Sequence, residues 1–377
     1  METRTKWKPL TNMKDLERVV LKVVKKNPSF FGADYQILKL AKGQTESIKM
    51  IIRARGNDYF LKAGDKVERE NAMYQLPNFK GDLFLEPIQG LNMPSNFILL
   101  PFIKGETLDE VAFISDISVG RLCDLLKKVL DQTAERLWLN NFKGKEFQSP
   151  NLVESLLNER MASLKEVEVG EKAHFIKFEN LSNFPINYYI GDDVYKLPSI
   201  KQMVSEVSRE IKKYNSNYVY SITGDFQPTN IIMGNDREFK IIDLSNAIIG
   251  GDIAFDIGKF FNFFNRFYFV SFLRDYNKVF FEKNSFVKID NGVIEAHFYP
   301  HKDLEKSYLV NVLEEEFVRN IAVRTKDYNL PDRVKLNKFV VNLITIKRHL
   351  RHTKLVDLLF IALFDSYLEV SQKVKTL

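Results

Sequence analysis

The sequence has few of the residues that mark several common protein classes. Cys123 is the only cysteine among 377 residues, which excludes an intramolecular disulfide framework and any need for an oxidising compartment. The 17 glycines and 12 prolines are too few for a collagen-like or low-complexity chain. The apolar share of 45% is that of an ordinary globular protein, so the chain can bury enough surface to offset the entropy of ordering.

Long apolar runs are missing as well. The most apolar stretch, residues 260–273, is interrupted by Asn262, Asn265 and Arg266, and it is shorter than the roughly 20 residues that a membrane helix requires. The first 20 residues carry charges throughout and lack the apolar centre of a signal peptide. We therefore expect a cytoplasmic protein without a membrane segment.

The charge balance leaves an anionic partner open. Net charge is +6, from 55 basic and 49 acidic residues, which permits binding of a nucleotide or a nucleic acid. Residues 324–354 hold nine basic residues against Asp327 and Asp332, and such a segment can bind phosphates. A solvated helix face is the commoner explanation, so a nucleic-acid partner is not favoured. The local basic excess also argues against a strongly polycationic substrate.

Hydrophobic periodicity divides the chain into a β-rich part and a helical part. Near the N-terminus we expect a helix over 13–26, strands over 35–40, 48–55 and 59–63, a helix over 65–76 capped by Asp65, and a strand over 97–103. Beyond Val111 we expect mainly helices, with a hairpin at 230–233 and 239–243 and a loop over 286–301. Residues 168–195 show no clear period. The composition changes near residues 101–106.

The chemistry-bearing residues are concentrated in residues 221–260. Asp225 is followed five positions later by Asn230, and Asp243 ends the second strand of the expected hairpin. In phosphoryl transfer one carboxylate orients the attacking hydroxyl and accepts its proton, while an amide oxygen and a second carboxylate hold Mg²⁺ against the phosphates of ATP. Such oxygen ligands suit Mg²⁺, which is a hard cation.

The same segment resembles the aminoglycoside phosphotransferase and choline kinase family, whose members are distant relatives of protein kinases. The matching residues stand here as Thr223-Gly224-Asp225, Asn230, Ile242-Asp243, Gly251-Asp252 and Asp256-Ile257-Gly258. The resemblance implies that Asp225 is the catalytic base, that Asn230 and Asp243 are metal ligands, and that Asp256 is a buried carboxylate bracing the catalytic loop. For Asp252 a capping or turn role is the better interpretation.

Two positions depart from the family pattern. Thr223 stands where the family usually has a histidine before Gly-Asp, and Gln227 replaces another frequent histidine. The first histidine generally supports loop geometry rather than transferring the proton. The departure weakens the inference of activity and does not exclude it.

The N-terminal strands offer a cation for the phosphates. Lys62 lies among apolar residues on the third expected strand, where a lysine is costly to bury unless it is paired. On the following helix Glu70 lies nearer the packed face than Glu68, and Arg69-Glu70 matches the family's Arg-Glu. We therefore expect Lys62 and Glu70 to form an ion pair beside the nucleotide.

Two further segments resemble the family's nucleotide-binding parts. Gly43–Ser47 lies between the first two strands, so Ser47 is positioned to reach a phosphate, although most such segments are ordinary hairpin turns. The apolar strand at 97–103 leads into a Gly-x-x-Leu turn, as in the family's hinge. Pro101 has no backbone N–H, which leaves Phe102 or Ile103 as the donor to the adenine edge.

Together these features predict an α+β, two-lobed protein-kinase-like fold with a small β-rich N-terminal lobe and a large helical C-terminal lobe. The lobes are expected at 1–100 and 106–377, joined by a hinge at 101–105, with the acceptor site among the C-terminal helices. The expected activity is ATP- and Mg²⁺-dependent transfer of the γ-phosphate to a hydroxyl of a small molecule. A catalytically weakened nucleotide-binding scaffold remains an alternative. A protein kinase is a second alternative, although the sequence lacks Asp-Phe-Gly and Ala-Pro-Glu motifs.

Overall fold

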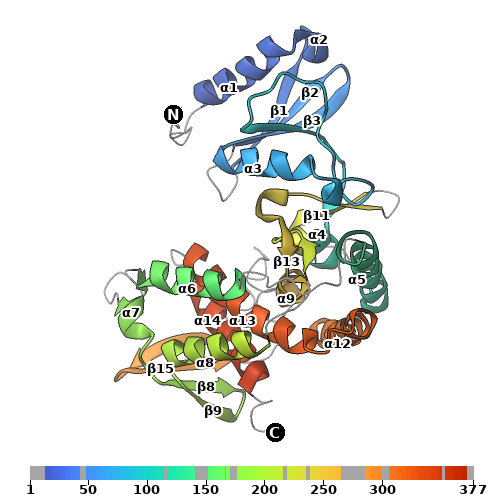
Figure 1. The fold of residues 1–377 in the computed structure, drawn as a ribbon. Helices are drawn as coiled ribbons and strands as arrows, with labels where there is room; N and C mark the ends of the chain where they lie inside the picture. Colours follow the sequence, from blue (N-terminus) through green and yellow to red (C-terminus); the bar gives the residue numbers. More distant parts are fainter. Residues whose placement is uncertain are drawn as a thin grey trace. The chain divides into compact units, whose positions relative to one another are not determined.

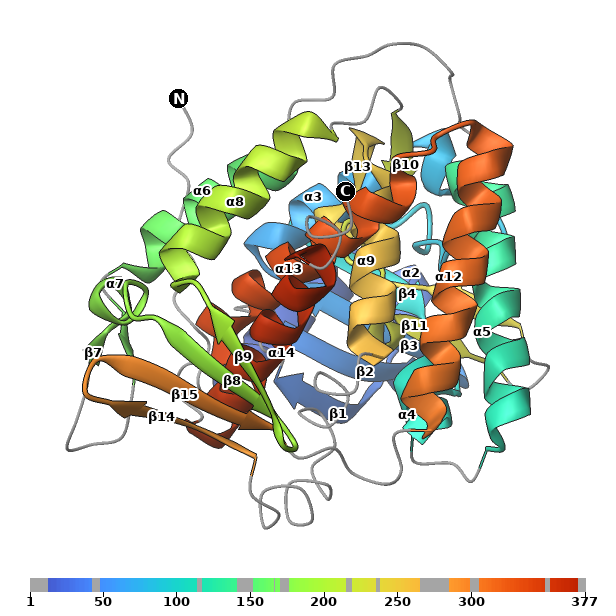
Figure 2. The same ribbon diagram turned by 90° about the horizontal axis from the view of Figure 1, so that it is seen from below.

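The structure is a computed structural model, and it is drawn in two views in Figures 1 and 2. It describes residues 13–42, 48–113, 117–140, 152–165, 167–169, 176–214, 219–234, 238–264, 285–298, 305–349 and 353–371. Contacts between Cα atoms divide the described residues into two compact units. The first unit lies within Met1–Ile114, Thr223–Asp225 and Thr229–Ile248; the second lies within Ser115–Ile222, Phe226–Pro228 and Ile249–Leu377.

This division departs from a simple boundary at residues 101–105. The loop and hairpin that carry the candidate catalytic residues, Thr223–Asp225 and Thr229–Ile248, cluster with the N-terminal sheet and not with the helices around them in the sequence. All of the predicted catalytic and metal-binding residues therefore belong to one unit. The assignment of functional lobes stays a prediction.

A four-stranded antiparallel sheet forms the centre of the first unit, in the order β1-β2-β3-β4. The strands are β1 (Gln36–Lys42), β2 (Ile48–Ala54), β3 (Asn57–Ala63) and β4 (Phe97–Pro101). Figure 1 shows α1 (Met13–Lys26) and α3 (Asp65–Tyr74) on opposite faces of this sheet. Because successive strand residues face opposite sides, the α1 face carries the apolar core and the α3 face is available for polar residues. The core on the α1 side includes Val20, Val23, Phe31, Met50, Ile52, Ala54, Leu61, Ala63, Phe97 and Leu99.

Turn chemistry places the two strands nearest the candidate site in register. Arg55 and Gly56 both have positive φ angles, of 49° and 77°, so β2 and β3 are joined by a two-residue turn of type I′. The expected strand over 48–55 therefore ends one residue earlier, at Ala54, because Arg55 already belongs to the turn. At the start of α3 the expected cap is wrong: Gly64 is the N-cap, and Asp65 is already the first helical residue.

A second, three-stranded sheet completes the first unit. Its order is β12-β11-β5, from strands β5 (Glu106–Thr107), β11 (Ile231–Met233) and β12 (Phe239–Ile241), and α4 (Leu108–Phe113) follows β5. The predicted hairpin is therefore present, and the chain leaving β4 pairs with it. Gly105 permits this approach, because a Cβ there would lie 2.1 Å from the carbonyl oxygen of Met233.

The second unit is mainly helical. Its longer helices are α5 (Val119–Thr133), α6 (Leu152–Leu164), α8 (Ile200–Lys213), α9 (Ile253–Phe264), α12 (Glu305–Thr325), α13 (Leu330–His349) and α14 (Thr353–Ser371). The helix α5 continues into a π-helical turn, Ala134–Trp138. Figure 2 shows α9, α13 and α14 side by side, with α12 next to α5. Gly258 allows α9 to approach α13 closely, since a Cβ there would lie 3.0 Å from the Cβ of Asn337.

Strands in the second unit correct two expectations. Residues 286–301 were expected to form a loop, but β14 (Phe286–Asp290) and β15 (Val293–Phe298) form a hairpin closed by Asn291-Gly292, whose φ angles are 49° and 77°. The segment without clear period contains β8 (Ile186–Ile190) and β9 (Asp193–Leu197), which join that hairpin in a sheet of order β14-β15-β8-β9. Shorter elements there are β6 (Glu168–Val169), β7 (Ile176–Lys177) and α7 (Phe178–Leu181).

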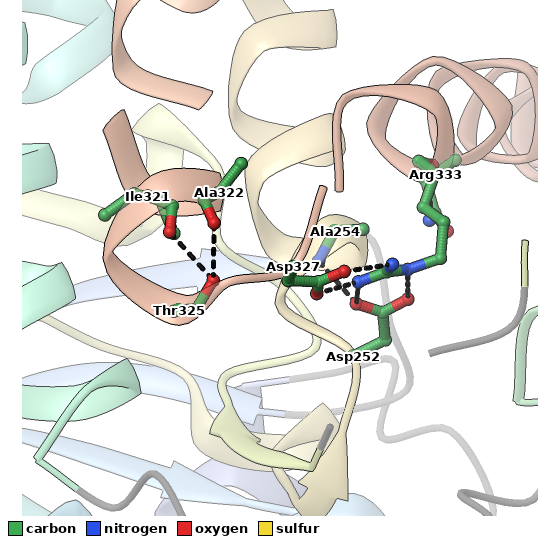
Figure 3. A network of polar contacts seen from close by, with 8 residues as sticks. Asp252, Ala254, Ile321, Ala322, Thr325, Asp327 and Arg333 are labelled. Atoms are coloured by element: carbon green, nitrogen blue, oxygen red, sulfur yellow. Dashed lines mark hydrogen bonds and ion pairs between the residues drawn. The ribbon is translucent and has the colours of Figure 1, made fainter. Parts of the chain in front are cut away.

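A buried arginine ties the start of α9 to the connection between α12 and α13 (Figure 3). Arg333 donates to Asp252 at 2.8 and 3.2 Å and to Asp327 at 2.9 and 2.6 Å. Asp252 also accepts the backbone N–H of Ala254 at 2.9 Å, so its expected capping role is present. The two carboxylates raise the pKa of Arg333 above its usual value, although burial alone would lower it.

The fold is mixed α+β, with a β-sheet N-terminal region and a helical C-terminal region, as the sequence predicted. Among the helices of the described residues, none combines the length and the apolar character that crossing a membrane would require.

Candidate functional site

Lys62 and two carboxylates form the centre of the site. The Nζ atom of Lys62 lies 2.6 Å from Oε2 of Glu70 and 3.1 Å from Oδ1 of Asp243. Strand β3 presents Lys62 on the face of the sheet covered by α3, and Glu70 is the helix residue that faces it. Glu68 is exposed, so the predicted choice between the two glutamates is correct. Lys62 and Glu70 are buried, with 5% and 1% of their surfaces exposed.

Burial and charge act differently on the three groups. Burial lowers the pKa of Lys62, but the carboxylates of Glu70 and Asp243 outweigh it and leave that pKa above its usual value. Burial raises the pKa of Glu70 despite the nearby ammonium group. Burial also opposes ionisation of Asp243, yet Lys62 and the Ser245 hydroxyl hold its pKa below the usual value. Of the two carboxylates beside Lys62, Asp243 is therefore the one whose ionised form is favoured.

The backbone at Asp243 is unusual. Its φ and ψ angles are 64° and 71°, a left-handed conformation that non-glycine residues seldom adopt. The side chain compensates locally: Oδ1 accepts the Ser245 hydroxyl at 2.7 Å and the Ser245 backbone N–H at 3.4 Å. Strained residues of this kind cluster at functional sites, where surrounding contacts hold them in place. The turn aims the carboxylate at Lys62 immediately after β12.

The predicted catalytic loop is held by short local contacts. Asp225 donates its backbone N–H to Oγ1 of Thr223 at 3.3 Å, and Nδ2 of Asn230 donates to the carbonyl of Asp225 at 3.0 Å. Gly224 has a φ of 65°, and a Cβ there would lie 2.1 Å from the carbonyl oxygen of Asn246. Thr223 thus contacts the backbone of Asp225 from the position where the family usually has a histidine.

The loop and the Asp243 turn are joined directly. Ile242 donates its backbone N–H to the carbonyl of Asn230 at 2.9 Å, and Nδ2 of Asn246 lies 3.4 Å from Oδ2 of Asp225. Sequence reasoning missed Asn246. Its position three residues after Asp243 gave no signal by itself, because the contact depends on how two loops fold back on each other.

Lys49 is a second residue that sequence reasoning missed. It lies on β2 directly opposite Lys62 on β3, and it is half-buried. Paired residues of neighbouring strands point to the same face of a sheet. The site therefore contains a second lysine, visible only once the register of the two strands is known.

The expected adenine-binding groups are placed as follows. The backbone N–H of Phe102 donates to the carbonyl of Asp58 at 3.1 Å and extends the pairing of β4 with β3. Within the described residues no backbone hydrogen bond engages the N–H of Ile103. Ile103 is thus the better candidate of the two donors. Ser47 and the rest of the turn between β1 and β2 lie outside the described residues.

The remaining motif residue, Asp256, belongs to the second unit. It is fully buried on α9, and Nε1 of Trp138 donates to its Oδ2 at 3.3 Å. The Trp138 ring makes an edge contact with Phe226, which stacks on Phe260. Asp256 thus contacts a buried aromatic cluster that includes Phe226, the residue that follows Asp225. This position agrees with a structural role for Asp256.

The basic segment at 324–354 is not simply a charged surface. Arg333 is buried against Asp252 and Asp327, and Lys338 is buried against Glu314 at 2.7 Å and Glu369. These two cations are already neutralised by carboxylates. The count of basic residues along the sequence therefore overstates the number of free positive charges that could bind a polyanion. For the same reason it is a weak argument about the charge of the substrate.

The oxygen donors of the site fit a magnesium ion. No cluster of three or more His, Cys, Asp or Glu suited to a metal occurs within the described part of the chain. Asn230 and Asp243 instead offer one amide oxygen and one firmly ionised carboxylate. Mg²⁺ commonly binds through one or two carboxylates and completes its shell with water and substrate phosphates.

Comparison with solved structures then decides the fold. Aminoglycoside phosphotransferase APH(4)-Ia superposes with a TM-score of 0.52 and 11% identity, covering 96% of this chain and 99% of its own. Ethanolamine kinase from Plasmodium vivax gives a TM-score of 0.53 and 13% identity, covering 97% of this chain and 92% of its own. The chain has the fold of these small-molecule kinases. LicA in complex with AMP is a further match, at 12% identity and a TM-score of 0.50, covering 94% of this chain and 98% of its own. No family model and no curated protein matches the sequence.

Proposed function

We propose that the protein is an ATP- and Mg²⁺-dependent phosphotransferase that moves the γ-phosphate of ATP to a hydroxyl group of a small molecule. The observation that carries the proposal is Lys62, which is buried between the carboxylates of Glu70 and Asp243. The similarity of fold to small-molecule kinases supports it. A further matching structure, of a thermostable APH(4)-Ia mutant, is a ternary complex with ADP and hygromycin B, and the LicA structure is a complex with AMP.

Each residue has a distinct part in this reaction. A lysine ammonium carries three N–H donors, and Glu70 and Asp243 engage two of those on Lys62, which leaves one for a phosphate oxygen. Asp225 accepts the proton of the acceptor hydroxyl while the oxygen of that hydroxyl forms a bond to the γ-phosphorus. The bond from that phosphorus to the bridging oxygen breaks, and ADP leaves with the electron pair.

The other polar residues hold this arrangement together. Asn230 and Asp243 would hold Mg²⁺, which when bound would neutralise negative charge on the phosphates. Thr223 and Asn246 position Asp225 through its backbone N–H and its carboxylate. The N–H of Ile103 is proposed to donate to the adenine edge, and Ser47 to contact a phosphate. The cytoplasmic location and the identity of the acceptor stay predictions.

Two matched variants test the proposal. In Asp225→Asn the side chain keeps its shape and loses its charge, so transfer should fall about 10²–10⁴-fold while ATP-Mg²⁺ affinity changes little. In Asp243→Asn both affinity and turnover should fall, because the metal-binding carboxylate is lost. Phosphoryl transfer is measured with a panel of hydroxyl-bearing metabolites and antibiotics, and affinity by calorimetry.

The same pair separates an enzyme from a scaffold. Wild-type protein that binds ATP but transfers phosphate to no member of the panel, together with an Asp225→Asn variant that keeps every cellular role, would favour the scaffold. Loss of nucleotide affinity in Asp225→Asn as large as that in Asp243→Asn would contradict the division of roles between the two carboxylates.

A further inference from the structure

Lys49 and Lys62 form a pair of like charges on one face of the sheet. They are directly opposite in the antiparallel pairing of β2 with β3, and side chains at such positions have Cβ atoms about 4.5–5.5 Å apart. Alternation along β2 places Met50 and Ile52 in the core on the α1 side, so Lys49 faces the side that carries Lys62. Like charges in this position destabilise a sheet, so the arrangement calls for a compensating group.

The surrounding carboxylates compensate only one of the two lysines. Glu70 and Asp243 lie within 4.0 Å of Lys62, whereas no carboxylate of the described residues lies that close to Lys49. The pKa of Lys49 is lowered mainly by burial and further by the charge of Lys62. The charge of Asp243 raises that pKa and offsets part of the decrease. Lys49 is thus a half-buried cation without an ion-pair partner in the described residues.

We propose that Lys49 is a second phosphate-binding cation of the nucleotide site, and that it gives the site a preference for nucleotides with longer, more highly charged phosphate chains. The proposal rests on the phosphotransferase function proposed above and adds a determinant of nucleotide selectivity to it. A polyanion between the two ammonium groups relieves their repulsion, and the relief grows with each phosphate that the ligand carries.

The rest of the same face suits a nucleotide. Ile51 and Phe60 are paired next along the two strands, and Phe60 is paired with Leu100 on β4. This row of apolar side chains begins two residues from the lysine pair. This arrangement, with apolar positions beside cationic ones, matches a ligand that has a flat apolar end and a polyanionic end. An inorganic anion would occupy only the cationic positions.

The test is to measure how affinity depends on the number of phosphates. Calorimetry gives the dissociation constants of ATP, ADP and AMP, in the same magnesium buffer, for wild type, Lys49→Met and Lys49→Arg. In Lys49→Met, ATP affinity should fall about 10- to 100-fold, ADP affinity less and AMP affinity least, because a charged hydrogen bond is lost only where a phosphate reaches it. Lys49→Arg, which keeps the charge, should recover most of the ATP affinity.

Arg53→Met provides a matched control. Arg53 is on the same strand and face, and its cation already pairs with Asp58 at 2.7 Å. Its loss removes one positive charge without removing the proposed contact, so all three affinities should stay at wild-type values. Thermal unfolding of Lys49→Met should show no loss of stability, since the variant removes a like-charge contact.

The outcomes separate this inference from the function on which it rests. Wild-type protein that binds none of the three nucleotides overturns both. If Lys62→Met loses ATP binding while Lys49→Met binds as wild type does, the phosphotransferase proposal stands and the role of Lys49 is wrong. An equal loss for ATP, ADP and AMP in Lys49→Met also overturns that role, because a contact to the base or a change of fold would produce it.

Discussion

Lys62 in the first unit and Lys338 in the second are both buried between two carboxylates, in very different surroundings. Lys338 on α13 lies 2.7 Å from Glu314 on α12 and 3.3 Å from Glu369 on α14, so helices supply all three groups. One partner of Lys62, Asp243, instead comes from a left-handed turn beside a polar loop. A buried ion pair is therefore no evidence of function by itself; the irregular backbone and the neighbouring polar groups make the difference.

The largest effect is expected at the helical ion pair, and it concerns stability. Lys338→Met leaves Glu314 buried next to Glu369 without a cation, which should lower the free energy of unfolding by about 3–5 kcal/mol. Urea denaturation measures the loss. Replacing Glu314 by Gln in the same chain should restore much of it, because the uncompensated charge is then removed. Unchanged stability in Lys338→Met would contradict the view that this pair is structural.

At Lys62 the corresponding effect should fall on catalysis. Lys62→Met is expected to reduce phosphoryl transfer about 10²–10³-fold, the usual cost of removing one positioned electrostatic contact to the reacting groups. Lys338→Met, assayed below its unfolding temperature, should retain the transfer rate of wild type per folded molecule. An equal loss of transfer rate per folded molecule in both variants would contradict this difference between the two lysines.

Acid titration should separate Asp243 from the two buried glutamates, Glu70 and Glu314. Burial raises the pKa of Glu70 and of Glu314, whereas Lys62 and Ser245 hold the pKa of Asp243 below its usual value despite burial. As pH falls, the two glutamates should therefore take up protons before Asp243 does. Carboxyl resonances in a 13C NMR titration report the order directly.

The same shifts fix the sign of the stability change. Asp243 contributes stability above its unfolded pKa, near 3.8, and this contribution is lost as pH falls through the lower folded value. Glu70 acts in the opposite sense, because its ionisation above pH 4.5 costs more in the folded protein than in the unfolded chain. Asp243→Asn should therefore remove an acid-sensitive part of the stability, and Glu70→Gln should not.

The smallest effect is expected at Thr223. Thr223→Val keeps the shape and removes the oxygen that accepts the Asp225 N–H, which should cost about 0.5–1.5 kcal/mol of stability and slow transfer by about 10-fold or less. Thr223→Ser retains the hydroxyl and should behave as wild type. A loss in Thr223→Val as large as that in Asp225→Asn would mean that Thr223 takes part in proton transfer itself.

The ion pair at Lys62 could be predicted because local periodicities determine it. Alternation along β3 gives the face of Lys62, and the helical period of α3 distinguishes Glu70 from Glu68. The order of Asp225, Asn230 and Asp243 along the chain likewise predicted a single site. These three residues and Lys62 do belong to one unit, which supports the fold-level part of the prediction.

Lys49 and Asn246 could not be predicted in the same way. The position of Lys49 depends on the register of β2 with β3, which the positive φ angles of Arg55 and Gly56 determine. Asn246 reaches Asp225 only through the path of two loops. In both cases the relevant partner is set by non-local geometry rather than by the residue's own neighbours in the chain.

The missed hairpin of the second unit has a different explanation. The Asn291-Gly292 dipeptide is a strong signal for a two-residue turn, and it is present in the sequence. The flanking strand β14 is mostly exposed or half-exposed and carries Lys288 and Asp290, so its alternation of apolar and polar residues is weak. In this segment the turn dipeptide predicts the hairpin better than the hydrophobic pattern does.

The glycine immediately before β5 has a consequence for mutational tolerance. Gly105 is exposed to solvent, and exposed positions ordinarily accept most amino acids. Here any side chain would begin 2.1 Å from a backbone oxygen of the strand that follows Asn230. In a library of all single substitutions, Gly105 should therefore be depleted as strongly as a core position, and the depletion should extend to alanine. Variation among natural homologues would then be restricted at a surface position for steric reasons alone.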